Sequence, residues 1–512
     1  MEHPVFELNL FGRNLEQELR PLIRAFFKDA EFEVNHDELT DEGASAIREG
    51  LLSSDCGQEY TLNMLLLEEQ LHIRLLHEGE TAGEVSEKVS DTERRAYRNQ
   101  VARALYRILS AETGKTLPWG ILTGVRPTKL VYEGLENGES EEALHRLMTE
   151  EYLCSEEKWN TALAVSKKEY RILQDIDYRN GYSIYIGIPF CPTTCHYCSF
   201  TSYPLKTNGK YADSYLDALE KELRFAAECF PEKKLSTVYI GGGTPTALNE
   251  TQFTRLLTMV RDYLPMEQVR EYTVEAGRPD SITEGKLRAM KELGVTRISI
   301  NPQTMQQRTL DLIGRQHTVE QIREAFAAAR RLGHDNINMD IIIGLTGEKP
   351  EDVADTLSEI GKLGPDSLTV HTLAVKRAAR LNTEKERYEG NEATGVLEML
   401  RETVAFAGEH GYEPYYLYRQ KNMAENLENV GYAREGSEGI YNILIMEEKQ
   451  TILALGAGAT SKYVFYGEDR IERTENVKSL KDYLERTGEM IERKRSFLRK
   501  NGKDLFGGEH GA

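Results

Sequence analysis

An alternation of strand-like and helix-like segments constrains the fold of this chain more than any other feature. From Ser183 onward, six short runs of apolar and β-branched residues follow one another, and stretches with helical periodicity separate them. The runs are SIYIGI, STVYIGG, REYTVEA, TRISIN, NINMDIII and SLTVHTL. Parallel strands need crossover connections, which helices usually supply. The pattern therefore predicts an α/β fold with a partial (β/α)6 barrel, in which the helices lie outside a parallel sheet.

The segments on either side of this alternation predict two further parts. Before it, the strand-like runs VFELNL, EFEV, NMLLLEE and LHIRLLHE accompany a helical NLEQELRPLIRAFF, and a helical pattern extends from Asp91 to about Thr113. After about Glu409, the runs EPYYLYR, IYNILIME and TILALGAG are typical of strands among helices and loops. We expect a small N-terminal α+β domain at residues 1–175, the barrel at 176–408 and a C-terminal α+β subdomain at 409–512.

The composition disfavours several classes of protein. The formal net charge of -20 argues against a general nucleic-acid binder, because binding to a phosphate backbone needs a concentrated basic surface. The sequence has no run of about 18 apolar residues and no start that resembles a signal peptide. We therefore expect a cytoplasmic protein without a membrane span. A small anionic substrate remains compatible with this charge, since it needs only a local basic pocket.

Three of the six cysteines lie close together, directly after the first barrel strand. In IPFCPTTCHYCSF, Cys191, Cys195 and Cys198 have the spacing C-x3-C-x2-C. Thiolates are soft ligands that suit an iron–sulfur cluster or zinc, and the spacing lets all three converge. Structural zinc normally takes four protein ligands, and His196 is a candidate for the fourth. However, His196 sits between two proposed ligands, where its side chain is expected to point elsewhere.

Polar residues and glycines recur where the predicted strands end. GGGTPT follows the second strand, Glu275 ends the third, Gln303 follows the fourth, and Asp340 lies in the fifth. His371 to Ala374 close the sixth. In barrels of this kind, the active site forms at the C-terminal ends of the strands. The sequence therefore predicts a ligand pocket there, in which the glycine loop lets the backbone approach the ligand closely.

The cysteine loop resembles the signature of radical S-adenosylmethionine (SAM) enzymes, in which three cysteines bind a 4Fe-4S cluster. The wider YIGIPFCPTTCHYCSF is similar to the oxygen-independent coproporphyrinogen III oxidase family, especially its HemZ-type branch. The resemblance implies that the metal ligands are Cys191, Cys195 and Cys198, and that the fourth iron binds SAM. An electron from the cluster then cleaves SAM to methionine and a 5′-deoxyadenosyl radical.

The resemblance also assigns SAM-binding roles to residues of the predicted pocket. It implies that the GGGTP motif contacts the methionine end of SAM through Gly242, Gly243 and Thr244, and that Glu275 contacts the ribose. The other positions that line this pocket or an adjacent second SAM site are Tyr185, Tyr197, Gln303, Arg315, Asp340 and Ala374. One or two molecules of SAM are therefore implied. The alternatives from the residues alone are a capping or salt-bridge carboxylate for Glu275 and a structural ion pair for Arg315.

Two positions depart from the family pattern. Gly187 stands where members commonly have histidine, and Phe200 stands where many have a fourth cysteine. Neither difference removes a predicted cluster ligand. They place the chain in the HemZ-type branch and leave open whether it performs the same chemistry as other members.

The resemblance implies an enzyme of haem biosynthesis that converts coproporphyrinogen III to protoporphyrinogen IX by oxidative decarboxylation. Its electrons would come from a donor of the flavodoxin or ferredoxin class. The tetrapyrrole propionates need cations, and the candidates are Lys376, Arg377, Arg380 and Arg419. A haem-binding chaperone of the same family and radical chemistry on another tetrapyrrole are the alternatives.

Overall fold

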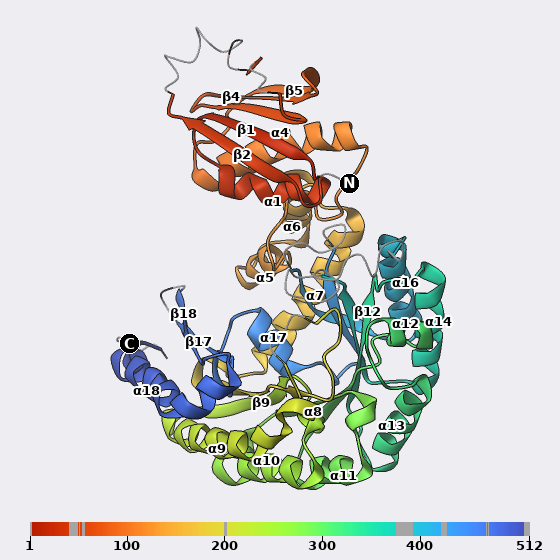
Figure 1. The fold of residues 1–512 in the computed structure, drawn as a ribbon. Helices are drawn as coiled ribbons and strands as arrows, with labels where there is room; N and C mark the ends of the chain where they lie inside the picture. Colours follow the sequence, from red (N-terminus) through yellow and green to blue (C-terminus); the bar gives the residue numbers. More distant parts are fainter. Residues whose placement is uncertain are drawn as a thin grey trace. The chain divides into compact units, whose positions relative to one another are not determined.

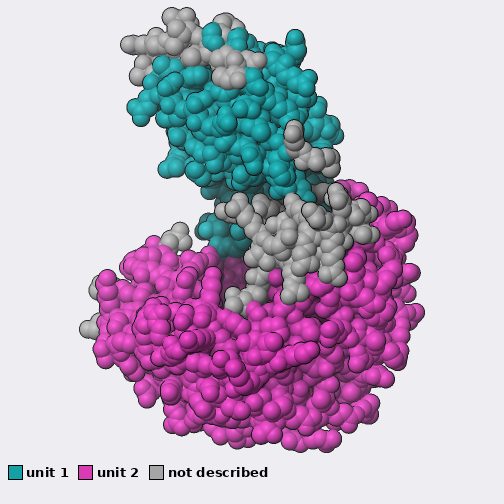
Figure 2. All heavy atoms as spheres, viewed as in Figure 1, with its two compact units in different colours: residues 1–166, 418–428 teal, residues 167–417, 429–512 magenta. Residues whose placement is uncertain are grey.

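The computed structural model of the chain contains two compact units. Unit 1 comprises residues 1–166 and 418–428, and unit 2 comprises residues 167–417 and 429–512 (Figure 2). The structure describes residues 3–39, 50, 52–53, 57–198, 202–374, 393–420, 427–466, 468 and 470–505. The domain boundaries expected at residues 175 and 408 stay predictions.

Unit 1 is built on a five-stranded sheet with the strand order β2-β1-β3-β4-β5. Its strands are β1 (Val5–Gly12), β2 (Glu31–Asp37), β3 (Tyr60–Leu66), β4 (Gln70–His77) and β5 (Glu80–Lys88). β1 runs parallel to β2 and β3, whereas β4 and β5 continue the sheet in antiparallel fashion. The helices α1 (Glu16–Phe26) and α4 (Arg94–Thr113) cover the face on which Phe6, Leu8 and Leu10 are fully buried (Figure 1). This is the α+β arrangement that the sequence predicts.

A helical segment completes unit 1 and holds a returning part of the chain. It contains α5 (Lys129–Glu136), α6 (Glu141–Arg146) and α7 (Glu156–Gln174), the last of which continues into unit 2. The Trp119 indole donates to Glu428 Oε2 at 2.8 Å, and Lys158 Nζ donates to Glu428 Oε1 at 2.6 Å. All three side chains are buried. Glu428 is therefore anchored inside unit 1 by a buried ion pair.

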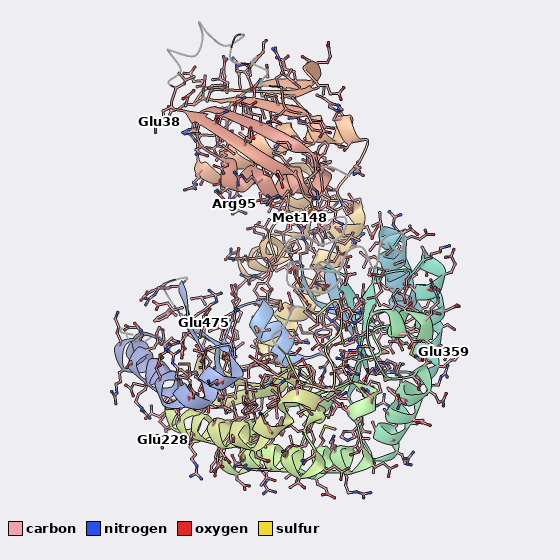
Figure 3. All side chains as sticks on the ribbon, viewed as in Figure 1. Glu38, Arg95, Met148, Glu228, Glu359 and Glu475 are labelled. Atoms are coloured by element: carbon pink, nitrogen blue, oxygen red, sulfur yellow. The ribbon has the colours of Figure 1, made fainter. Side chains whose placement is uncertain are left out.

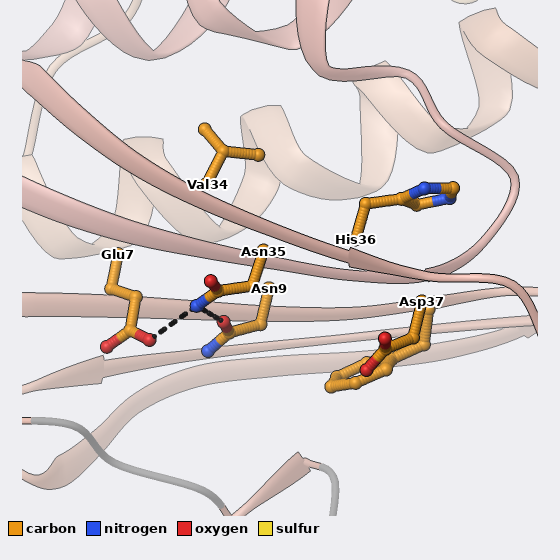
Figure 4. Close-up of a pocket in the computed structure, with 7 residues that line it drawn as sticks. Glu7, Asn9, Val34, Asn35, His36 and Asp37 are labelled. Atoms are coloured by element: carbon orange, nitrogen blue, oxygen red, sulfur yellow. Dashed lines mark hydrogen bonds between the residues drawn. The ribbon is translucent and has the colours of Figure 1, made fainter.

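Unit 1 also carries a shallow hollow at the edge of its sheet (Figure 4). It measures about 480 Å³ and is lined by Glu7, Asn9, Phe11, Val34, Asn35, His36 and Asp37. The Asn35 amide donates to Glu7 Oε1 at 2.9 Å and to Asn9 Oδ1 at 2.8 Å. None of the site residues predicted from the sequence lines this hollow.

Unit 2 contains the predicted partial barrel. Six strands pair in parallel in chain order: β6 (Gly181–Ile188), β9 (Lys234–Gly242), β10 (Glu271–Gly277), β11 (Arg297–Ile300), β12 (Ile337–Ile343) and β13 (Ser367–Thr372). The helices outside them are α9 (Ala212–Cys229), α10 (Glu250–Tyr263), α11 (Glu284–Glu292), α13 (Val319–Arg331) and α14 (Pro350–Leu363) (Figure 1). Their outer faces carry charged side chains such as Glu228 on α9 (Figure 3). The six strands coincide with the six apolar runs, so the predicted α/β barrel is confirmed.

The C-terminal residues extend the barrel sheet at both edges to eleven strands. At one edge, β15 (Asn429–Ala433) pairs antiparallel with β13, and β14 (Glu413–Tyr418) lies outside it. At the other edge, β16 (Thr451–Leu455) pairs parallel with β6, and β17 (Thr460–Phe465) and β18 (Arg470–Glu475) follow. The helices of this part are α16 (Val396–Glu409) and α18 (Leu480–Leu505). Among the helices in the described parts of the chain, none is long and apolar enough to cross a membrane.

The strand predicted for IYNILIME is wrong, because Ile440–Met446 forms the helix α17. A short apolar run has no periodicity that separates a strand from a buried helix. The backbone N–H groups of Ile440 and Tyr441 donate to the Glu271 carboxylate at 2.6 and 3.2 Å, and an anion at a helix N-terminus stabilises the first turn. Since Glu271 begins β10, α17 starts at the N-terminal ends of the barrel strands.

Candidate cofactor site

Five of the six barrel strands present one partly exposed side chain in the middle of the strand. These residues are Tyr185, Tyr239, Glu275, Asp340 and His371. Their immediate neighbours along each strand are buried. Because helices cover the outer face of the sheet and these side chains contact one another, the exposed surface belongs to the barrel interior. Two of the predicted SAM carboxylates, Glu275 and Asp340, therefore lie in an accessible interior.

Glu275 is held in place by the second barrel strand. The Tyr239 hydroxyl donates to Glu275 Oε1 at 2.5 Å. A Cβ at Gly241 would come within 2.8 Å of the Glu275 side chain, so glycine leaves the room that this carboxylate occupies. Burial, together with the charge of Asp340, raises the pKa of Glu275 to about 7, although the hydrogen bond from Tyr239 acts in the opposite direction. An oriented carboxylate of this kind can accept hydrogen bonds from ligand hydroxyls.

Asp340 belongs to a chain of hydrogen bonds between neighbouring strands. Asn338 Nδ2 donates to Asp340 Oδ1 at 2.6 Å, and the Ser367 hydroxyl donates to Asn338 Oδ1 at 3.0 Å. Arg297 Nη2 donates to the Ser367 hydroxyl, also at 3.0 Å. Asp340 Oδ2 lies 3.9 Å from His371 Nε2. Burial would raise the pKa of Asp340, but the hydrogen bond and charge of His371 lower it overall, so this interior carboxylate is ionised.

Three tyrosines form an aromatic wall below the carboxylates. The ring of Tyr239 lies 6.2 Å from that of Tyr185 and 4.5 Å from that of Tyr441, and both pairs are stacked. Tyr441 belongs to α17 and is 5% exposed. Neither Tyr239 nor Tyr441 is among the site residues predicted from the sequence. The helix α17 therefore contributes to the floor of the barrel.

The glycine loop after β9 is packed against the strand that leads into the cysteine loop. Gly242 has a φ of +104°, a conformation that residues with a Cβ rarely adopt. At Gly243, a Cβ would come within 2.5 Å of the Phe190 carbonyl oxygen. The Thr244 N–H donates to that same oxygen at 2.7 Å, and the Thr244 hydroxyl lies 3.6 Å from Cys191 Sγ. Both glycines are thus needed for the loop to approach the cysteines.

The three clustered cysteines are partly exposed and free of disulfides. β7 (Phe190–Cys191) pairs with β8 (Tyr203–Pro204), and the Cys198 N–H donates to the Cys195 carbonyl oxygen at 3.2 Å. Burial raises the pKa of the Cys191 thiol, and the hydrogen bond from Thr244 opposes this effect. Within the described ranges, no three His, Cys, Asp or Glu side chains are arranged as a metal site as they stand. The role of Cys191, Cys195 and Cys198 as cluster ligands stays a prediction.

His196 is directed at the end of α12 (Gln307–Leu312) rather than at the thiols. The backbone N–H of His196 donates to the Ile313 carbonyl oxygen at 2.9 Å, and the imidazole Nδ1 lies 3.1 Å from the Leu312 carbonyl oxygen. A Cβ at Gly314 would come within 2.6 Å of the imidazole. This orientation does not favour His196 as the fourth ligand of a zinc site.

Arg315 is a buried cation beside the cysteine loop. It is 6% exposed, and its Nη1 donates to the Asn301 carbonyl oxygen. Burial would lower the pKa of Arg315, but the hydroxyl of Tyr197 and the thiol of Cys195 both interact with the guanidinium and raise it overall. The structure therefore brings Arg315 and Tyr197 together with the cysteines.

Gln303 has the most constrained backbone of the predicted SAM residues. Its φ is +68°, in the left-handed region that residues with side chains rarely adopt. The Gln303 N–H donates to the Asp340 carbonyl oxygen, and the Ile342 N–H donates to the Gln303 carbonyl oxygen, both at 2.9 Å. Its side-chain Oε1 is buried without a hydrogen-bond partner. This strained turn therefore aims an unsatisfied amide oxygen into the protein.

The barrel interior offers further hydrogen-bonding atoms that a ligand could use. In the parts of the chain that the structure describes, Thr273 Oγ1, Ser299 Oγ and Asn301 Oδ1 are buried without a partner, like Gln303 Oε1. Ser299 pairs with Glu275 across β10 and β11. An unsatisfied buried polar group costs about 1–3 kcal/mol, which a ligand with hydroxyl and amine groups can relieve. The residues present therefore fit a nucleoside joined to an amino acid, as SAM is.

The predicted substrate cations are not assembled at this site by the described residues. Ala374 is the last described residue after β13. Three of the four cations lie outside the described residues: Lys376, Arg377 and Arg380. Arg419 lies in unit 1, where it is 2% exposed and donates from Nη1 to the Leu122 carbonyl oxygen at 2.8 Å. Substrate binding by these four residues stays a prediction.

Comparison with known proteins gives consistent matches. The model of the radical SAM superfamily matches residues 185–360. The chain is 44% identical over 415 residues to the oxygen-independent coproporphyrinogen-III oxidase-like protein HemZ of Bacillus subtilis, covering 80% of this chain and 83% of that protein. It is 31% identical over 313 residues to heme chaperone HemW of the same organism, covering 59% and 75%. The structure of coproporphyrinogen III oxidase (HemN) from Escherichia coli covers 62% of this chain and 72% of that chain, at 26% identity and a TM-score of 0.49.

The partial barrel, the cysteine loop on its first strand and the match to the superfamily model define a radical SAM protein. Members of this superfamily use a 4Fe-4S cluster and SAM. Within the superfamily, the chain belongs to the family of oxygen-independent coproporphyrinogen III oxidase-like proteins.

Proposed function

We propose that this chain is an enzyme that converts coproporphyrinogen III to protoporphyrinogen IX by oxidative decarboxylation. One observation carries the proposal: the glycine loop is bonded to the start of the cysteine loop, and two carboxylates, Glu275 and Asp340, lie in the interior of the same barrel. The similarity to a coproporphyrinogen-III oxidase-like protein over most of both chains supports the choice of substrate.

In this proposal, the 4Fe-4S cluster is held by Cys191, Cys195 and Cys198. When bound, the cluster and SAM supply a 5′-deoxyadenosyl radical that removes a hydrogen atom from the β-carbon of a substrate propionate. The chain binds and orients SAM with the residues that line the interior. Glu275 accepts hydrogen bonds from the ribose hydroxyls while the Tyr239 hydroxyl keeps its carboxylate in place.

The remaining predicted contacts surround SAM or an adjacent second SAM molecule. Gly242, Gly243 and Thr244 approach the methionine end, since their loop lacks bulky side chains beside the cysteine loop. The unsatisfied Gln303 Oε1 can accept a hydrogen bond from a ligand amine. The remaining residues of this proposed set are Tyr185, Tyr197, Arg315, Asp340 and Ala374.

The substrate end of the site would hold the tetrapyrrole while its propionate reacts. After loss of the hydrogen atom, carbon dioxide departs and one electron passes to a separate one-electron acceptor, which leaves a vinyl group, and repetition on a second propionate completes the conversion. The propionates that are not reacting need cations, for which Lys376, Arg377, Arg380 and Arg419 are the candidates. We propose a flavodoxin- or ferredoxin-class protein as the electron donor to the cluster.

Anaerobic incubation of reconstituted full-length protein with SAM, a low-potential reductant and coproporphyrinogen III tests the proposal. We expect vinyl products, with one SAM cleaved for each vinyl group formed. A matched Cys195→Ala variant should form none. SAM cleavage without any vinyl product would show that coproporphyrinogen III is not the substrate.

A haem chaperone is the second candidate, because the chain is 31% identical to a protein of that name over 313 residues. A chaperone must bind haem reversibly and release it to a partner, and it need not consume SAM when a porphyrinogen is present. Haem titration followed by optical spectroscopy separates the two functions. Tight binding of one haem per chain, together with no vinyl formation, would favour the chaperone over the oxidase.

A further inference from the structure

Arg278 is a buried arginine that connects the end of β10 with the cysteine loop. It follows the last residue of β10 and is 2% exposed. Its Nη1 donates to the carbonyl oxygen of Thr193 at 3.1 Å and to the Thr193 hydroxyl at 2.6 Å. Thr193 stands between Cys191 and Cys195, so both bonds act on the segment that joins the first two clustered cysteines.

The other side of the guanidinium is fixed by Asp280. Arg278 Nε donates to Asp280 Oδ1 at 3.0 Å, and Arg278 Nη2 donates to Asp280 Oδ2 at 2.6 Å. A bidentate pair of this kind fixes the plane of the guanidinium. Because Asp280 belongs to the turn that directly follows β10, the barrel itself orients Arg278 toward the loop.

The cysteine loop has few other side-chain bonds between its first two cysteines. Among the described residues between Cys191 and Cys195, Thr193 alone has a side chain that forms a hydrogen bond. On the far side of the loop, His196 is bonded to the end of α12. Arg278 and the α12 end therefore hold the loop from two different strand–helix units.

We propose that Arg278 is a positioning residue for the iron–sulfur cluster, which holds Thr193 so that Cys191 and Cys195 are presented before the cluster binds. This inference rests on the proposed assignment of the three cysteines as cluster ligands. A loop that is already ordered loses less conformational entropy when it binds, so the cluster is held more tightly. Arg278 contributes this order without being a ligand.

Hydrogen exchange in the cluster-free full-length chain tests the positioning directly. In Arg278→Gln, backbone amides of residues 193–198 should exchange on the order of tenfold faster than in the wild type, since charge-assisted hydrogen bonds are lost. Arg297→Gln is the matched control, because Arg297 is also 2% exposed but donates to Ser367 in the barrel. This control should leave exchange in the cysteine loop unchanged. Equal exchange of the loop in wild type and Arg278→Gln would overturn the proposal.

Two milder variants keep the test decisive if Arg278→Gln does not fold. Thr193→Val removes only the hydroxyl acceptor, and Arg278→Lys keeps the positive charge but loses the planar fork. Both should accelerate exchange in the loop by a smaller factor than Arg278→Gln. If neither changes the exchange, Arg278 does not hold the loop.

Cluster retention supplies the second readout. After anaerobic reconstitution, iron loss to a chelator should be faster from Arg278→Lys than from the wild type by roughly the same factor as its loop exchange, because a less ordered loop opens more often. Unchanged iron loss despite faster loop exchange would show that loop order does not govern cluster retention, and would also overturn the proposal. If the wild-type protein binds no four-iron cluster at all, the proposed function fails. Hydrogen exchange is measured in the cluster-free chain, so it still shows whether Arg278 orders the loop, and the two failures can be told apart.

Discussion

Replacing Glu275 by glutamine is expected to stabilise the chain above neutral pH while weakening its affinity for SAM. Burial raises the pKa of this carboxyl from 4.5 to about 7, against the hydrogen bond from Tyr239, and the charge of Asp340 adds to the increase. A difference of about 2.5 between the unfolded and folded pKa values corresponds to about 3 kcal/mol of unfolding free energy.

The sign follows from the folded pKa being the higher of the two. The native state holds the proton more tightly, so the stability that Glu275 contributes is present below pH 4.5 and is lost as the pH rises through about 7. Glutamine carries no charge at any of these pH values. The unfolding free energy of Glu275→Gln should therefore exceed that of the wild type by about 3 kcal/mol near pH 8, and by about half as much near pH 5.5.

Denaturant unfolding followed by far-ultraviolet circular dichroism measures this difference. Tryptophan fluorescence is unsuitable, because the two tryptophans of the chain, Trp119 and Trp159, both lie in unit 1. Glu348→Gln is the matched control: Glu348 is 1% exposed, accepts a hydrogen bond from Thr304 at 2.6 Å, and has a pKa raised to about 7 by burial. It should show the same pH dependence with unchanged SAM affinity. A stability difference for Glu275→Gln that does not vary with pH would refute the reasoning.

Three further variants test other parts of the structure. Tyr239→Phe removes the hydroxyl that orients Glu275 and should weaken SAM binding roughly tenfold in calorimetry, and unchanged affinity would exclude this role. Gln303→Ala should lower vinyl formation roughly a hundredfold while iron content stays constant, if a positioning contact at the reacting centre is lost; a proportional loss of iron would indicate a structural role instead. Lys158→Met leaves the buried Glu428 carboxylate without its cation and should destabilise unit 1 by roughly 3–5 kcal/mol, measured by tryptophan fluorescence; Lys158→Met combined with Glu428→Gln should recover part of that loss.

The barrel could be predicted from the sequence because parallel strands are buried on both faces. Such strands appear as continuous apolar runs, and an acidic residue inside one is conspicuous. Asp340 in NINMDIII is such a residue, and it indeed has partners in Asn338 and His371. The glycine loop was predicted as part of the ligand pocket for a different reason, because glycines at the end of a strand let the backbone approach a ligand closely.

Other residues of the site carry no comparable signal in the sequence. Tyr239 resembles an ordinary core tyrosine in STVYIGG, and its role depends on a carboxylate 36 positions away. Tyr441 was missed because its segment was predicted as a strand. Arg278 donates a hydrogen bond to Thr193, which is 85 positions away. Contacts over such separations depend on how strands and helices pack together, and local sequence patterns do not encode this packing.

The contacts at the barrel floor make α17 part of the same site as the barrel strands. Glu271 holds the first turn of α17, and this turn places the ring of Tyr441 against that of Tyr239. Tyr239 in turn donates to Glu275, which lies further along the same strand as Glu271. β10 therefore fixes both ends of this connection. Because the linkage closes on one strand, a displacement of α17 cannot leave the Glu275 carboxylate unaffected, and the residues after the barrel help to set the geometry of the proposed ribose contact.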